Sequence, residues 1–335
     1  MNITSNFLSS LRTIGLAAVA VSMFAGLAGA ADLKAKLGIS TWIGYTPLYI
    51  AIEKGYFKDQ GLDLEIVVFN GNEAQTAFAA GRLDGFTTSG DSLIVLANQG
   101  KDFKIVHVTD FSEGGDGILA RNTVKDLADV KGRRIAVQEI AVSHFYLLFA
   151  LAKVGLKESD VTLVNLSPDA AAAAYQSGQV DVAVTWAPYL GQVNRQVKEG
   201  RIIHDTSKAP GLITDFYLFD TQFIKDNPKA VKAFVKGVFR GLEYFKANRK
   251  EGLAIAAKRL EVTPEALAED LKGIAIPDVE TNVAAIGDPK NPMYVVNTLE
   301  PLAKFLVEKK QVKKAPDMSK YIDATFVLEI QKEGL

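Results

Sequence analysis

Two stretches with nearly the same pattern decide the fold: AGRLDGFTTSGDSL at 80–93 and SGQVDVAVTWAPYL at 177–190. Identical residues recur between them at a constant offset of 97 positions, namely Gly81 with Gly178, Asp84 with Asp181, Thr88 with Thr185, and Leu93 with Leu190. The same offset relates KIVH at 104–107 to RIIH at 201–204. The sequence therefore predicts two copies of one structural unit.

The composition is typical of a folded globular protein, because 48% of the 335 residues are hydrophobic and 23% are charged. The formal net charge is −1, and no cluster of lysine and arginine is interleaved with aromatic residues, which argues against a nucleic-acid partner. Three histidines without ligand-like spacing argue against a metal site. Because the sequence also shows no P-loop, no G-x-S-x-G motif and no catalytic triad, we expect neither a cofactor nor an enzyme.

The N-terminus has the pattern of a secretory signal peptide: an apolar run at 14–27 is followed by AGA at 28–30. We expect a signal peptide at 1–30, cleaved after Ala30, and export to the periplasm. A retained membrane anchor is the alternative, because an apolar segment at 14–31 is just long enough to span a bilayer. The chain has no cysteine, so it can form neither a disulfide nor a lipid-modified cysteine, which fits a freely soluble periplasmic protein.

Short apolar runs alternate with segments of helical period, which is the pattern of βαβ units and a parallel sheet. In the first copy we expect strands at 36–41, 62–69, 85–89 and 104–109, and helices at 47–57, 73–80 and 92–99. In the second copy we expect strands at 134–138, 161–166, 180–186 and 201–206, and helices at 143–154, 169–176 and 189–198. Each copy is therefore predicted to form a small α/β lobe.

Two further strands are expected to connect the lobes, DGILAR at 116–121 outward and ITDFYLFD at 213–220 on the return. The C-terminal third has helical spacing, with start signals at Asn227-Pro228 and Thr263-Pro264. We assign these helices to the lobe that the return strand re-enters. The predicted organisation is lobe 1 at 31–117 plus 217–335 and lobe 2 at 118–216. Two connections make a hinge, and ligands of open α/β sheets bind beyond the carboxyl ends of the strands.

Four stretches carry a resemblance to a known family: WIGYTPLYIAIEKGYFKDQGLDLEIVVF at 42–69, AAGRLDGFTTSGDSL at 79–93, SHFYLLFALAKVGL at 143–156 and VDVAVTWAPYL at 180–190. Together they resemble the nitrate/sulfonate/taurine-type periplasmic solute-binding proteins of ABC importers. The resemblance implies an α/β protein of the type II periplasmic-binding fold, with two lobes, two hinge strands and a ligand cleft between the lobes. It also implies a small-molecule solute, delivery to a membrane permease with its ATPase, a monomer, and no membrane contact except through the permease.

The loops at the predicted strand ends contain no lysine or arginine but several carboxylates and aromatic residues. The candidate ligand-binding residues are Trp42, Tyr45, Asn72, Ser89, Asp91, Asp110, Asp116, Ser143, Trp186 and Tyr189. Such a cleft favours a cationic or amide-like solute, through charge-assisted hydrogen bonds and cation–π contacts. The segment DFSEGGDG at 110–117 resembles that of a subgroup associated with urea- or guanidine-like solutes. An anion could still be bound by backbone N–H groups at 90–92.

Several of these residues also have structural interpretations. Asp91 can stabilise a helix start through the helix dipole, and Asp110 and Asp116 can cap the Gly114-Gly115 turn. The tryptophans can belong to the core, and Ser143 can be a helix cap.

Three other functions stay open at the sequence level. They are a binding protein for a thiamine pyrimidine precursor, a synthase-like enzyme of the same fold, and a sensory module that binds the same solute. The absence of cysteine removes the Cys-rich motif expected of the enzyme.

Overall fold

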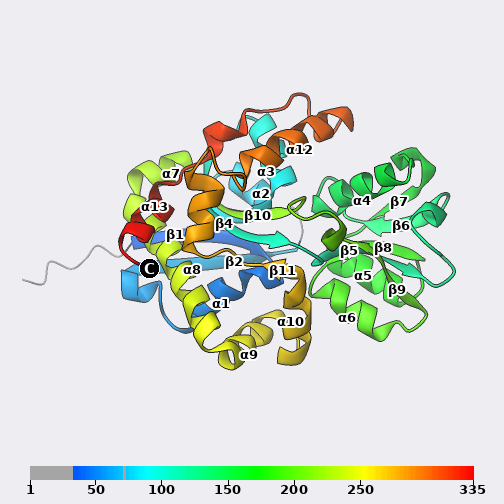
Figure 1. Cartoon of the computed structure of the whole chain (residues 1–335), viewed down its shortest axis with the longest axis horizontal. Coiled ribbons are helices and arrows are strands. Elements are labelled where there is room, and N and C mark those ends of the chain that lie inside the picture. Colours follow the sequence, from blue (N-terminus) through cyan, green and yellow to red (C-terminus); the bar gives the residue numbers. More distant parts are fainter. Residues whose placement is uncertain (1–32, 71–72) are drawn as a thin grey trace, which may run out of the picture. The chain divides into compact units, whose positions relative to one another are not determined.

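The computed structural model describes residues 33–70 and 73–335. The predicted signal peptide at 1–30 and the candidate residue Asn72 lie outside the described residues. Residues 33–335 form one compact unit of mixed α/β structure (Figure 1). Within the described part of the chain, no helix combines the length and the apolar character needed to cross a membrane.

The first sheet has six strands in the order β11-β4-β10-β3-β1-β2. Their bounds are β1 (Leu33–Ser40), β2 (Leu62–Phe69), β3 (Gly85–Ser89), β4 (Phe103–Ser112), β10 (Thr214–Asp220) and β11 (Ile274–Ala275). Strands β1, β2 and β3 are parallel, whereas β10 runs antiparallel to both of its neighbours, β3 and β4. The amino end of β10 therefore lies at the same edge of the sheet as the carboxyl ends of β1 and β3.

The second sheet has five strands in the order β7-β6-β8-β5-β9. Their bounds are β5 (Asp116–Arg121), β6 (Arg134–Val137), β7 (Thr162–Asn165), β8 (Val182–Trp186) and β9 (Gly200–Asp205). Strands β6, β7 and β8 are parallel, and β5 runs antiparallel to β8 and β9. This order matches β2-β1-β3-β10-β4 of the first sheet, with the connecting strands β5 and β10 in equivalent places. The predicted duplication is therefore present in the topology.

The repeated sequence has the same local role in both copies. The helices of the two copies are α1 (Thr46–Glu53), α2 (Glu73–Ala79), α3 (Gly90–Asn98), α4 (Val142–Lys153), α5 (Pro168–Gln176) and α6 (Tyr189–Gln196). Gly81 follows α2 with φ +70° and Gly178 follows α5 with φ +78°, a left-handed conformation that glycine adopts without strain. The carboxylate of Asp84 then accepts the Lys36 backbone N–H at 2.7 Å, and that of Asp181 accepts Nη1 of Arg133 at 3.2 Å. Both repeated aspartates thus bind the neighbouring parallel strand or the residue before it.

The remaining helices follow β10. They are α7 (Thr221–Asp226), α8 (Pro228–Ala247), α9 (Arg249–Leu260), α10 (Pro264–Asp270), α11 (Val279–Asn282), α12 (Val296–Glu308) and α13 (Thr325–Lys332). Thr263 caps α10 as its sequence signal predicts, because its Oγ1 accepts the Ala266 N–H at 3.1 Å. Helix α8 packs on α1 and β1, α12 on α3, and α13 on α8, so the C-terminal helices cover the first sheet. Figure 1 shows helices above and below each sheet in that view.

The chain passes between the sheets twice, at 113–115 and at 206–213. The two passages are bonded to each other: Ser112 Oγ lies 2.8 Å from Thr206 Oγ1, which also accepts the Gly114 N–H at 2.7 Å. The lobe boundaries after Gly117 and Phe216 stay a prediction, because residues 33–335 form a single compact unit.

Most element bounds agree with the prediction to within one or two residues. Strands 62–69 and 85–89 match to the residue. The prediction was wrong by more at three places. Strand β1 begins at Leu33, before the predicted start at 36, because β2 pairs with its first residues. The first helix ends at Glu53 because the chain turns at Gly55, which has φ +73°. Strand β4 continues to Ser112, beyond the predicted end at 109, because β10 and β11 pair with its last residues.

Candidate functional site

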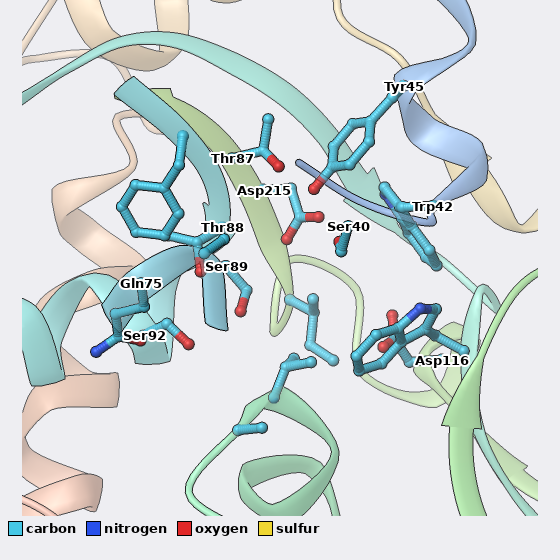
Figure 2. A pocket seen from close by; sticks show the side chains of 16 residues that line it. Ser40, Trp42, Tyr45, Gln75, Thr87, Thr88, Ser89, Ser92, Asp116 and Asp215 are labelled. Atoms are coloured by element: carbon cyan, nitrogen blue, oxygen red, sulfur yellow. The ribbon is translucent and has the colours of Figure 1, made fainter. Parts of the chain in front are cut away.

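A cavity lies at the edge where β1, β3 and β8 end and where β5 and β10 begin (Figure 2). The side chains that line it come from both sheets: Ser40, Trp42, Tyr45, Ala74, Gln75, Phe86, Thr87, Thr88, Ser89, Ser92, Asp116, Ala141, Val142, Trp186, Ile213 and Asp215. The volume open to the centre of a water molecule is about 60 Å³. The cavity therefore has room for a small solute and not just for a single water molecule.

Sheet pairing brings three aspartates together at this edge. Asp215 on β10 lies directly opposite Asp110 on β4 and, on its other side, opposite Ser89 on β3. Asp116 is the first residue of β5 and pairs with Trp186 on β8. Asp110 and Asp116 are only 1% and 4% exposed. Like charges directly opposite each other in a sheet are destabilising, so this arrangement needs a compensating interaction.

The carboxylates have fewer partners than buried charges require. The indole Nε1 of Trp42 donates to Asp110 Oδ2 at 2.9 Å, but Asp110 Oδ1 and Asp116 Oδ2 are buried without any hydrogen-bond partner. Asp215 lines the cavity. Within the described residues, no lysine or arginine is among the groups that act on any of the three. An unpaired buried carboxylate is costly, so the cavity is electrostatically incomplete without a positive group.

Burial and mutual repulsion change the acidity of these carboxyl groups. Burial, and next the charge of Asp91, raises the pKa of Asp116 to about 7. Burial also raises the pKa of Asp110, although the Trp42 hydrogen bond opposes the shift, and the neighbouring charge of Asp116 adds to it. The pKa of Asp215 is raised by burial and then by the charges of Asp110, Asp116 and Asp91. A bound cation would lower all three pKa values.

Two aromatic side chains border the acidic groups, and two glycines allow one of them to come close. A Cβ on Gly44 would lie 2.0 Å from Asp110 Oδ2, and a Cβ on Gly115 would lie 2.7 Å from Trp42 Cη2. Trp42 therefore contacts Asp110 only because both neighbours lack a side chain. Figure 2 shows the Tyr45 hydroxyl directed toward Ser40 and Asp215. Burial, and next the charge of Asp215, raises the pKa of Tyr45 well above its usual range.

Trp186 connects the two sheets at the cavity. Its indole Nε1 donates to the carbonyl oxygen of Thr41, in the loop after β1, at 3.0 Å. The second sheet thus contacts the first at the cavity through a residue that also lines it.

The Gly114-Gly115 turn does not use the aspartates as caps. The Gly114 N–H donates to Thr206 Oγ1 at 2.7 Å, and the Gly115 N–H donates to the Gly273 carbonyl oxygen at 3.1 Å. The capping interpretation of Asp110 and Asp116 is therefore wrong, because other groups satisfy the turn. Both carboxylates are left for another partner.

Of the described candidate residues, the structure places Trp42, Tyr45, Ser89, Asp116 and Trp186 in the cavity lining. The other four described candidates, Asp91, Asp110, Ser143 and Tyr189, lie outside the lining, although Asp110 contacts the lining residue Trp42.

Asp91 lies beside the cavity and accepts the Ser89 hydroxyl at 2.7 Å, in the first turn of α3. Ser143 is buried next to Val142 with an unpartnered hydroxyl, and Tyr189 is half-buried at the start of α6. Asp91 and Ser143 thus belong to the helix starts that border the cavity.

Asp215 is the most important residue that the sequence analysis did not identify. The predicted site residues follow the carboxyl ends of parallel strands, but Asp215 lies near the amino end of the antiparallel strand β10. An antiparallel strand begins where its parallel neighbours end, so the first residues of 213–220 carried the missing signal. The polar lining residues Ser40, Gln75, Thr87, Thr88 and Ser92 were also not singled out.

The remaining polar side chains do not form a metal site. Among residues 33–70 and 73–335, no group of three acidic or histidine side chains is arranged to hold a metal ion. His107 on β4 is 2% exposed and packs between the rings of Tyr217 and Phe239, with centroid distances of 5.4 and 4.7 Å. Burial lowers the pKa of His107 to about 3, so the ring is neutral.

Two α/β lobes of one topology, joined by two connecting strands with a cavity at the strand ends, define the type II periplasmic-binding fold. The family model described as NMT1/THI5 like matches residues 42–252, and the chain belongs to this family, whose members include periplasmic solute-binding proteins.

Individual relatives agree with this assignment. The chain is 30% identical over 300 residues to the putative aliphatic sulfonates-binding protein of Bacillus subtilis, covering 86% of each chain. It is 29% identical over 286 residues to the taurine-binding periplasmic protein of Escherichia coli K12, covering 81% of this chain and 86% of the relative. Its fold is similar to that of the alkanesulfonate-binding protein of Xanthomonas axonopodis pv. citri bound to MOPS. That structure has a TM-score of 0.72 at 18% identity and covers 87% of this chain and 98% of the other.

Proposed function

We propose that the protein captures a small cationic or amide-like solute, of the guanidine or urea type, in the periplasm and delivers it to the permease of an ABC importer. The relatives named as taurine- and sulfonate-binding proteins support the transport role. The chemistry of the cavity supports a different solute from theirs. The predicted signal peptide at 1–30 supports export, and we expect the exported chain to act as a monomer.

One observation carries the choice of solute: the carboxylates of Asp116 and Asp215 line one cavity, and Asp110 lies behind them opposite Asp215, without a basic partner in the described residues. A sulfonate or nitrate would add a further negative charge there, and the lining offers no lysine or arginine to offset it. A guanidinium group provides a positive charge and N–H donors in a planar fork that matches a carboxylate. The nearby rings of Trp42 and Trp186 can also contact a cation through their faces.

The polar lining of the cavity also suits a small planar solute. The lining hydroxyls of Ser40, Thr87 and Ser89 can accept or donate hydrogen bonds at the remaining edges of a planar solute.

Capture would proceed by hinge closure. The lining includes residues of both sheets, so a solute that contacts both stabilises the closed arrangement more than the open one. The two chain passages at 113–115 and 206–213 are the segments about which the lobes would turn.

The experiment that tests this proposal is thermal unfolding of the chain from Ala31 onward with millimolar guanidine, urea, small amines, taurine, alkanesulfonates, nitrate or bicarbonate. A solute at about 100 times its dissociation constant adds about 2.7 kcal/mol to the unfolding free energy and raises the midpoint by several degrees. We expect a shift with guanidine, a small amine or urea. A shift with a sulfonate or nitrate alone would contradict the proposal and would indicate an anion site at the start of α3.

A matched control separates binding from surface effects. Asp63 on β2 is exposed and pairs with Lys34 only through the strand register. Asp63→Asn removes one negative charge from the surface and should keep the same midpoint shift as the wild type.

A further inference from the structure

Each of the two connecting strands brings one aspartate to the cavity. Asp116 is the first residue of β5 in the second sheet, and Asp215 is the second residue of β10 in the first sheet. These strands occupy equivalent places, each antiparallel between the third and fourth strands of its copy. The cavity therefore receives one carboxylate from each sheet, next to the segments about which the lobes would turn.

The surroundings of this pair contain no positive group among the described residues. Asp116 is 4% exposed, and its Oδ2 has no hydrogen-bond partner although it lines the cavity. The titratable groups that act on the pair or are affected by it are Asp91, Asp110, Tyr45, Tyr146 and Tyr217, all of them acids. Ionisation of both aspartates therefore opposes approach of the lobes, unless a cation lies between them.

We propose that the solute is a planar monovalent cation with N–H groups on two edges, a guanidinium or amidinium, that bridges Asp116 of one lobe to Asp215 of the other. This inference rests on the proposed function and narrows it, because a neutral amide of the same shape cannot offset the two charges. Asp116 and Asp215 are then the residues that determine specificity. Closure depends on the charge of the solute as well as on its shape.

The cavity should favour the cation over protons as the pH rises. Burial raises the pKa of Asp116 to about 7, so this carboxyl group is largely protonated in the empty cavity at pH 5.5 and largely ionised at pH 8. The cation binds the ionised form and competes with the proton. Affinity for the cation should therefore increase from pH 5.5 to pH 8, by up to about tenfold for each pH unit below the pKa.

The test is titration calorimetry with guanidinium chloride and with urea at pH 8, on the wild type, Asp116→Asn, Asp215→Asn and the control Asp63→Asn. Circular dichroism establishes that each variant is folded, and small-angle scattering with and without guanidinium reports closure. We expect the wild type and Asp63→Asn to bind guanidinium well and urea poorly. Each cavity variant should lose about 10- to 100-fold in guanidinium affinity, because a charged hydrogen-bond partner is removed. Guanidinium should compact the wild type but not Asp116→Asn.

Each contrary outcome has one meaning. If guanidinium binds the wild type and both cavity variants equally, the bridging role is overturned while the proposed function stands. If urea binds the wild type as tightly as guanidinium, the requirement for a cation is overturned, again without loss of the proposed function. If neither binds and taurine or an alkanesulfonate does, the proposed solute class fails and the inference fails with it. Should Asp215→Asn not fold, Asp116→Asn alone still decides between these outcomes.

Discussion

Replacing Asp116 by asparagine should stabilise the protein in the absence of solute, and mainly at high pH. Asp116 is 4% exposed and its Oδ2 has no partner, so ionisation of this group in the empty cavity is unfavourable. Burial raises its pKa from the usual 3.8 to about 7. Because the folded-state pKa lies above the unfolded-state value, the stabilising effect of the protonated form is complete below pH 3.8 and is lost as the pH rises through 7.

The size of this effect follows from the pKa difference. A difference of about three units corresponds to about 4 kcal/mol, at 1.36 kcal/mol for each unit. About 3 kcal/mol of this falls between pH 5 and pH 8, because the folded group titrates near 7. For a chain of this length, roughly 2 °C of unfolding midpoint corresponds to 1 kcal/mol. The midpoint gained by Asp116→Asn should therefore be about 6 °C larger at pH 8 than at pH 5.

The assay is thermal unfolding followed by circular dichroism at pH 5 and pH 8, in acetate and phosphate buffers without amines. Any cost of burying the asparagine amide is the same at both pH values, so only the difference between the two pH values is interpreted. The exposed control Asp63→Asn should change the midpoint little at either pH. An equal change for Asp116→Asn at pH 5 and pH 8 would refute the reasoning, because the carboxylate would then carry no unfavourable charge.

Three further predictions concern the surroundings of the cavity. Trp42→Phe removes the donor to Asp110 Oδ2 and should weaken guanidinium binding about tenfold in calorimetry; unchanged binding would show that this hydrogen bond does not position the carboxylate. Gly44→Ala places a methyl group 2.0 Å from Asp110 Oδ2 and should lower the unfolding free energy, measured by urea titration, by about 1–3 kcal/mol. A loss below about 0.5 kcal/mol would argue against tight packing around Gly44. Arg195→Ala breaks the ion pair between α6 and α10, in which Arg195 contacts Asp270 at 2.6 and 3.1 Å. Because the arginine side chain is 38% exposed, we expect only a two- to fivefold loss of solute affinity. An unaltered affinity would mean that this ion pair does not favour closure.

Much of the fold could be predicted because its signals are local or repeated. The alternation of apolar runs and helical segments identified every strand of both sheets except β11, and the offset of 97 residues identified the duplication. The glycines at 81 and 178 recur because each copy needs the same left-handed turn, and the aspartates at 84 and 181 each accept a hydrogen bond at the neighbouring parallel strand, from the Lys36 backbone and the Arg133 side chain respectively. Local sequence signals were therefore sufficient to predict the strands and turns that the two copies share.

The site was less predictable because it depends on pairing between distant strands. Asp110 and Asp215 are more than 100 positions apart, and only the antiparallel register of β10 with β4 places them opposite each other. The sequence also could not show that Thr206 and Gly273 satisfy the glycine turn, which leaves the aspartates without that role. The sequence did show that the loops at the strand ends are acidic and contain no lysine, because this property depends only on the composition of the loops.

The most direct measurement is a crystal structure of the protein grown with guanidinium chloride and taurine at equal millimolar concentrations at pH 8. The proposed site predicts planar density for a group of four non-hydrogen atoms, within hydrogen-bond distance of the Asp116 and Asp215 carboxylates. Density for a sulfonate against the backbone N–H groups at the start of α3, near Ser92, with the aspartates uncontacted, would contradict it.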